Sequence, residues 1–126
     1  MPEELPLPSF SDARHASSWA YSPDASRLLA AASEHRRAHS IRPSGDDAKN
    51  VHLLLIDVQK DFCFPEGTLY VAGRSGVGAM ADSARVASFV YRNLDRITSI
   101  TATLEASPPE SRPASLTPPS VAGGAQ

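Results

Sequence analysis

The residue best suited to chemistry in this chain is Asp57, which ends an apolar run that starts at Val51 and is broken only by His52. A run of this kind, bounded by polar residues, is typical of a strand covered on both faces in a parallel sheet. Functional groups collect at the carboxyl edge of such sheets. We expect Asp57 to stand at that edge, where burial tunes a carboxylate for proton transfer. The alternative is an Asp that only stabilises the following turn.

Two further carboxylates, Asp61 and Glu66, follow closely in the sequence. Oxygen ligands of this kind suit a divalent cation, so a small metal-dependent hydrolase that uses Asp57 and Asp61 is an alternative. A phosphatase with a strand-Asp-x-Asp pattern would need an Asp at position 59, where this chain has Gln59. Gln59 argues against such a phosphatase, and our preferred prediction is that the chain has no metal site.

Cys63 is the single cysteine and the other obvious candidate for chemistry. It lies between Phe62 and Phe64, and all four histidines precede it in the chain. A free cysteine in apolar surroundings is usually a small buried hydrophobe, and we expect that here. The two phenylalanines are suited to stacking on a flat substrate beside Asp57 or simply to packing. The glycines at 73, 76 and 78 are suited to holding an anion at a helix start, but turn formation explains them better.

The elements that must position these residues follow from periodicity. Apolar spacing and Pro23 at a helix start predict a helix from residue 22 or 23 to about 39. The pattern then predicts four further elements: a strand at 51–57, an extended piece at 68–71, a helix at about 79–95 and a strand at 97–104. Strand, helix and strand form one βαβ unit with parallel strands. We divide the chain into an irregular arm (1–21), a folded part (22–105) and a disordered Pro/Ser/Ala tail (106–126).

Bulk properties narrow the classes of function. The net charge of −2 and a pI near 6.0 provide no basic field, so we predict no nucleic-acid or acidic-membrane partner. No apolar stretch approaches the length of about 20 residues that a membrane span needs, and the first residues do not resemble a signal peptide. A single cysteine excludes an internal disulfide and is typical of a reducing compartment. We therefore expect a cytoplasmic protein.

The segment from Leu54 to Cys63, followed by Gly67 to Gly73, closely resembles the first catalytic segment of the isochorismatase-like cysteine hydrolases, which include the nicotinamidases. The resemblance extends over residues 22–105. It implies a three-layer α/β/α fold with a largely parallel sheet, and hydrolysis of a small amide through a Cys acyl-enzyme. An Asp at the end of the first strand deprotonates that Cys, with help from a Lys. Asp57 matches the catalytic Asp, Phe62 matches an aromatic residue of the substrate pocket, and Gln59 lies beside them as a second substrate-binding candidate.

The departures from the family pattern are equally informative. Lys60 and Cys63 lie inside the first motif and do not correspond to the family's Lys and nucleophilic Cys. Many relatives follow the second strand with Thr-Leu-Asp and a nearby metal-binding His, whereas this chain has Thr103, Leu104 and Glu105 and then loses the resemblance. We therefore expect a truncated, incomplete α/β/α fold with no cofactor, inactive alone because a base without a nucleophile cannot form an acyl-enzyme.

Two strands and one connecting helix cannot cover both faces of the strand at 51–57. Either the N-terminal helix covers the second face, or the sheet continues in residues that this chain lacks, which we favour. A competing hypothesis is a non-catalytic interaction fragment that completes its sheet with a partner chain. Exposed strand edges favour such pairing, including a homo-oligomer.

Overall fold

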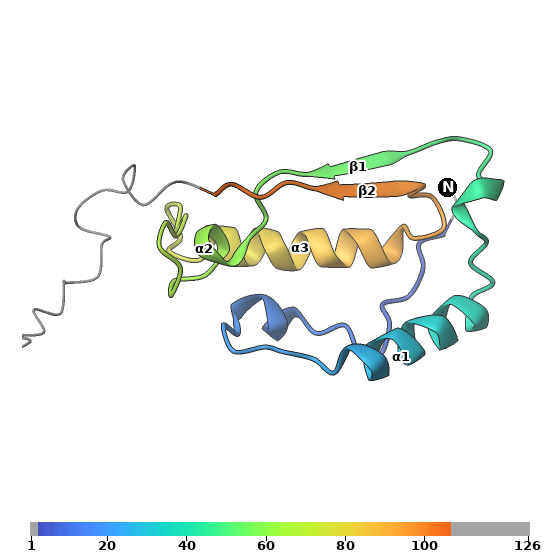
Figure 1. Ribbon diagram of the computed structural model, residues 1–126, viewed down its shortest axis with the longest axis horizontal. Coiled ribbons are helices and arrows are strands. Elements are labelled where there is room, and N and C mark those ends of the chain that lie inside the picture. The colour runs from blue at the N-terminus through green and yellow to red at the C-terminus, as the bar shows by residue number, and fades with distance from the viewer. Residues whose placement is uncertain (1–2, 107–126) are drawn as a thin grey trace, which may run out of the picture.

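The structure is a computed structural model that describes residues 3–106 (Figure 1). It has mixed helices and strands around a two-stranded parallel sheet. Its elements in chain order are the 3-10 helix η1 (Ala13–Ser17), α1 (Ala25–Ala38), the 3-10 helix η2 (Ser44–Asp46), β1 (His52–Leu55), α2 (Lys60–Cys63), α3 (Gly78–Arg92) and β2 (Ser99–Ala102). Apart from Ala106, the predicted tail lies outside the described residues, as do the first two residues of the predicted arm.

The predicted βαβ unit is confirmed. β1 and β2 pair in parallel, with His52 opposite Ser99 and Leu55 opposite Ala102. Both strands are shorter than predicted because the chain leaves the sheet early. Asp57 has a φ of 55° in the left-handed region, which ends the extended run at once. The prediction of an extended piece at 68–71 is wrong, because the chain turns at residues 68 and 69 and forms no strand there.

The helices begin and end where side chains satisfy their free backbone groups. α1 starts after Asp24, whose carboxylate accepts a hydrogen bond from the Arg27 amide at 3.0 Å. The predicted start at residue 22 or 23 is therefore wrong by two or three positions. α3 ends at Arg92 rather than near 95, since the Asn93 side chain donates to the Phe89 carbonyl and the chain then turns.

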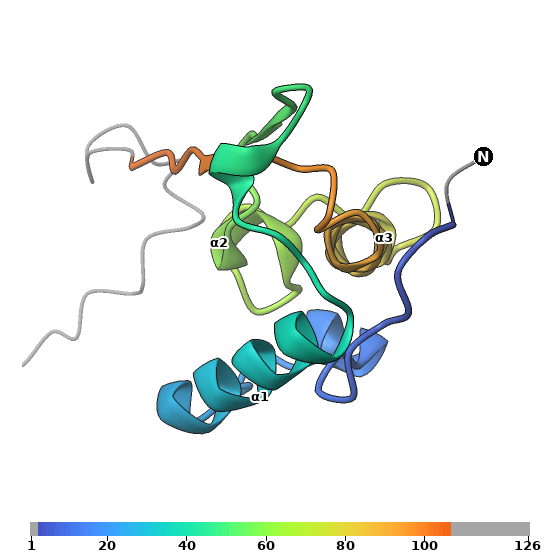
Figure 2. The ribbon, with the colours of Figure 1, turned by 90° about the vertical axis from the view of Figure 1, so that its right-hand side faces the viewer.

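Figures 1 and 2 show the layers. α3 lies under the sheet and runs along both strands, while η1 and α1 lie on the other side of α3. α1 therefore does not cover the second face of the sheet, and within residues 3–106 that face has no helix on it. Leu54, on the face away from α3, is 51% exposed. Whether further strands extend the sheet stays a prediction.

The buried residues of the described part of the chain are Pro8 in the arm and Cys63 and Phe64 at the end of α2. Cys63 and Phe64 are both buried, at 9% exposed, which confirms the prediction of a buried thiol. The Trp19 ring packs edge-on against Phe64 with ring centres 5.7 Å apart, so the N-terminal arm covers this cluster. The Lys60 ammonium lies 5.3 Å from the centre of the Trp19 ring and donates to the Trp19 carbonyl at 2.9 Å. The arm is thus held to α2 and its C-terminal end by aromatic and cationic contacts.

None of the helices in the part of the chain that the structure describes has both the length and the apolar character needed to cross a membrane.

His35 makes the stability of this fold depend on pH. Its Nε2 is buried on the inner side of α1, with no hydrogen-bond partner among residues 3–106. Burial first, and then the neighbouring His39 ring at 4.5 Å, lower the pKa of His35 below its ordinary value of 6.5. The unfolded chain therefore takes up a proton near pH 6.5 that the folded chain resists, and the free energy of unfolding falls as the pH drops through this value.

We predict that urea denaturation at pH 5 and pH 7.5 gives a larger loss of stability at pH 5 for the wild type than for His35→Leu, which removes the titrating group. His52→Leu is the matched control, because His52 is exposed on β1. Equal pH dependence in the wild type and His35→Leu would contradict this account.

Candidate functional site

Asp57 stands just beyond the carboxyl end of β1, as predicted. Its left-handed backbone conformation turns the chain sharply out of the sheet, and Asp is among the few non-glycine residues that adopt it readily. The Asp57 carbonyl accepts a hydrogen bond from the Gln59 amide at 2.9 Å, which closes the turn. The turn leads directly into α2, so the conformation of Asp57 sets the direction in which the chain leaves the strand.

Thr103 fixes Asp57 from the neighbouring strand. The Thr103 hydroxyl accepts a hydrogen bond from the Asp57 amide at 3.0 Å and donates one to Asp57 Oδ1, also at 3.0 Å. The Thr103 amide donates to the Leu55 carbonyl at 2.8 Å, which extends the parallel pairing by one step. Among the described residues, Oδ2 of Asp57 receives no hydrogen bond. The carboxylate is therefore oriented by one oxygen and has the other available to accept a proton.

Gln59 continues the connection between the two strand ends. Its amide nitrogen donates to the Glu105 carbonyl at 3.1 Å, and its amide oxygen accepts from the Glu105 amide at 2.8 Å. The Gln59 side chain thus forms two hydrogen bonds with the Glu105 backbone, as a neighbouring strand would do if β2 continued to this residue. Both polar atoms of Gln59 are occupied in this arrangement, so a substrate contact of Gln59 requires this pair to open and stays a prediction.

Phe62 lies beside Asp57, as the sequence predicted. The two residues line a hollow with a volume of about 280 Å³ between the end of β1, α2 and α3. Its other lining residues are mostly small or apolar: Ile56, Val58, Cys63, Val71, Ala79, Asp82, Ser83 and Val86. Phe64 is directed elsewhere, against Trp19. A carboxylate at the rim of a small apolar hollow is suited to taking a proton from a small, flat, uncharged molecule or from a nucleophile that attacks it.

The loop after α2 braces this hollow by folding back on the helix. The Leu69 amide donates to the Asp61 carbonyl at 3.0 Å, and the Val71 amide donates to the Phe62 carbonyl at 2.9 Å. The chain passes so close at Gly67 that a Cβ there would lie 2.4 Å from the Asp61 carbonyl oxygen. Only glycine fits this position, so Gly67 is a structural requirement of the site.

The later glycines form turns. Gly73 and Gly76 have φ values of 64° and 80°, and the Tyr70 hydroxyl donates to the Gly76 carbonyl at 2.6 Å. These left-handed conformations explain the glycines without an anion, which confirms the interpretation of this segment as turns.

The metal alternative finds no ligand set in the structure. Within residues 3–106, no three side chains of His, Cys, Asp or Glu come together in an arrangement that would hold a metal ion. Lys60 points away from Asp57, toward the arm and the Trp19 carbonyl. The charged groups that sequence reasoning placed near Asp57 therefore do not form a cluster with it in the described part of the chain.

Thr103 is the site residue that sequence reasoning missed. It lies 46 positions from Asp57, and only the parallel register of β1 and β2 brings them together. A hydroxyl one residue beyond the end of the neighbouring strand is the sequence signal that would have indicated it.

We predict that Thr103→Val lowers the free energy of unfolding by about 1–3 kcal/mol, because it removes a donor to a carboxylate and an acceptor for an amide. Thr103→Ser keeps the hydroxyl and should recover most of this loss. Thr101→Val, on the exposed face of β2, is the matched control and should change stability by less than about 0.5 kcal/mol. Urea denaturation measures all three, and equal effects of Thr103→Val and Thr101→Val would contradict the role of Thr103.

No protein-family model matches the chain, and no curated protein or solved structure matches it either.

Proposed function

We propose that this chain supplies the base-bearing segment of an isochorismatase-like cysteine hydrolase that acts on a small amide. The observation that carries the proposal is the position of Asp57. Its carboxylate is oriented by Thr103 at the end of β1 and borders a hollow lined by Phe62. The resemblance of residues 54–73 to the first catalytic segment of that family supports the same role.

In the proposed reaction, Asp57 accepts the proton of a cysteine thiol. The thiolate attacks the amide carbonyl carbon, and the tetrahedral intermediate expels the amine, which leaves with a proton. Water then cleaves the thioester to release the acid and restore the thiol. Phe62 supports the flat substrate from one wall of the hollow.

The nucleophile in this proposal comes from outside these 126 residues. Cys63, the only cysteine of the sequence, lines the same hollow but is buried at 9% exposed, and we assign it to packing. The isolated chain is therefore a binding and proton-accepting half of a site, without turnover of its own. The free thiol that the reaction needs fits a reducing, cytoplasmic location.

The second candidate is a non-catalytic fragment that completes its sheet with a partner chain. The observation that favours it is the small sheet itself: in the described residues each strand has one neighbour only, and Leu54 is 51% exposed. Pairing between two copies would produce a homo-oligomer. Light scattering of the purified chain tests this candidate, and a stable monomer at millimolar concentration would contradict pairing between copies.

For the hydrolase proposal we predict that the purified chain releases no ammonia from nicotinamide, because the nucleophile is missing. Millimolar nicotinamide should nevertheless shift the amide NMR signals of Asp57, Phe62 and Val71, which border the hollow. Phe62→Ala should reduce these shifts severalfold, whereas Phe89→Ala, on an exposed position of α3, should leave them unchanged.

Ammonia release that Asp57→Ala abolishes would contradict the assignment of an incomplete site. An absence of shifts around Asp57 would contradict the substrate class.

A further inference from the structure

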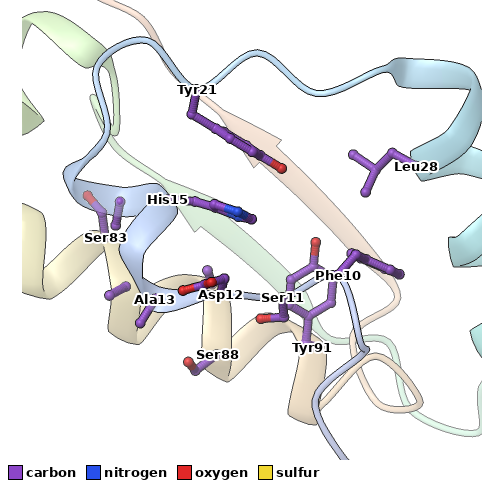
Figure 3. Close-up of a pocket in the computed structure, with 13 residues that line it drawn as sticks. Phe10, Ser11, Asp12, Ala13, His15, Tyr21, Leu28, Ser83, Ser88 and Tyr91 are labelled. Atoms are coloured by element: carbon purple, nitrogen blue, oxygen red, sulfur yellow. The ribbon is translucent and has the colours of Figure 1, made fainter.

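A second cavity lies on the opposite side of α3 from the sheet, and the proposed hydrolase role makes no use of it. We call it the arm cavity. It has a volume of about 320 Å³ and lies where η1 and its flanking residues pack against α3, near the start of α1 (Figure 3). Its lining residues are Phe10, Ser11, Asp12, Ala13, His15, Ala16, Tyr21, Leu28, Ser83, Ala84, Ala87, Ser88 and Tyr91. The volume is at the lower end of the range for small-molecule sites, which begins at about 300 Å³.

The walls of the arm cavity are aromatic. The His15 and Tyr21 rings stack with centres 3.9 Å apart and planes inclined by 14°. The Phe10 ring meets Tyr91 edge-on with ring centres 5.6 Å apart. These two pairs offer flat faces and ring edges to the space between them. Such surfaces favour a planar, aromatic occupant.

Polar groups without protein partners converge on the same space. Figure 3 shows the Tyr21 and Tyr91 hydroxyls and the His15 ring pointing into the cavity. Within residues 3–106, the hydroxyls of Tyr21, Tyr91 and Ser88 form no hydrogen bond. These hydroxyls are accessible to solvent, since His35 Nε2 is the buried side-chain atom of residues 3–106 that has no partner, and they are therefore free to bind a ligand that enters the cavity. Burial, and then the neighbouring Tyr21, raise the pKa of Tyr91, so its hydroxyl stays protonated and able to donate.

The charge of the lining selects among planar ligands. No Lys or Arg occurs among the described residues that line the arm cavity, and His15 is the one basic side chain there, so the lining offers little compensation for a phosphate or carboxylate. Its one carboxylate, Asp12, is bound by the Arg14 guanidinium at 2.6 and 3.0 Å, and these bonds hold the pKa of Asp12 at about 2. Asp12 is thus already neutralised by its partner. The lining therefore favours an uncharged ligand.

We propose that the arm cavity binds a small, uncharged, planar nitrogen heterocycle, which stacks on the aromatic walls and hydrogen-bonds to the Tyr21, Tyr91 and Ser88 hydroxyls. Bound in this position, the ligand connects the N-terminal arm to α3. This site is separate from the hollow at Asp57, apart from Ser83 of α3, which lines both.

The test is an NMR titration of the full chain with adenine as the probe and benzoate as an anionic comparator of similar size. Adenine should shift the amide signals of the arm around residues 10–16 and those of Ser88 and Tyr91. Benzoate at the same concentration should cause much smaller shifts. Tyr91→Phe and Tyr21→Phe keep the rings and remove one hydroxyl each, so each should weaken adenine binding about fivefold. Tyr70→Phe makes the same chemical change outside the cavity and should alter binding less than twofold.

The amide spectrum also reports whether each variant keeps its fold, and Ser88→Ala provides a third, smaller change in the same lining. An absence of adenine shifts at the arm would overturn the proposal. It would equally fail if benzoate bound as tightly as adenine, or if Phe62→Ala, which alters the other hollow, abolished adenine binding. Failure of nicotinamide to bind at Asp57 would leave this result unaffected, so the two proposals are tested separately.

Discussion

The hydroxyl of Thr103 holds together the part of the structure on which the proposed chemistry depends. It accepts the amide proton of Asp57 and donates to the carboxylate of the same residue, so one side chain fixes both the backbone turn and the acidic group. Asp57 has the left-handed backbone conformation, which aspartate adopts more readily than most residues with a Cβ, and the contacts with Thr103 hold it there. Gln59 and Glu105 then extend the connection by two further hydrogen bonds. The end of β2 thus determines the geometry of the turn after β1.

α3 is the central element of the part of the chain that the structure describes. One of its sides lies under the sheet and borders the hollow at Asp57, and its other side receives η1 and borders the arm cavity (Figures 1 and 2). No side chain of residues 3–106 is fully buried, and the buried pair Cys63 and Phe64 is covered in part by Trp19 from the arm. Because the fold buries so little apolar area, we expect its free energy of unfolding to be small. Contacts of the arm therefore contribute substantially to keeping the site in place.

Local sequence patterns predicted the order and type of the main elements well. The apolar run before Asp57 and the β-branched residues before Thr103 indicated two strands, and helical spacing indicated the two long helices between and before them. Boundaries were less accurate because single residues determine them: the φ of Asp57 ends β1, the carboxylate of Asp24 starts α1 and the amide of Asn93 ends α3. The juxtaposition of Asp57 with Phe62 was also foreseeable, since the two residues are only five positions apart in the sequence. The role of Thr103 was not foreseeable, because it depends on a strand register that brings together two residues 46 positions apart.

The central claim is that the two strand ends are fixed to each other at Asp57, and amide hydrogen exchange of the purified chain tests it most directly. The amides of Asp57, Thr103 and Glu105 donate to Thr103, Leu55 and Gln59 respectively, although Asp57 and Glu105 lie beyond the regular strands. The account predicts that these three amides exchange as slowly as those within β1 and much more slowly than the amide of Ala106. Exchange of all three at the rate of an unstructured chain, while β1 remains protected, would contradict it.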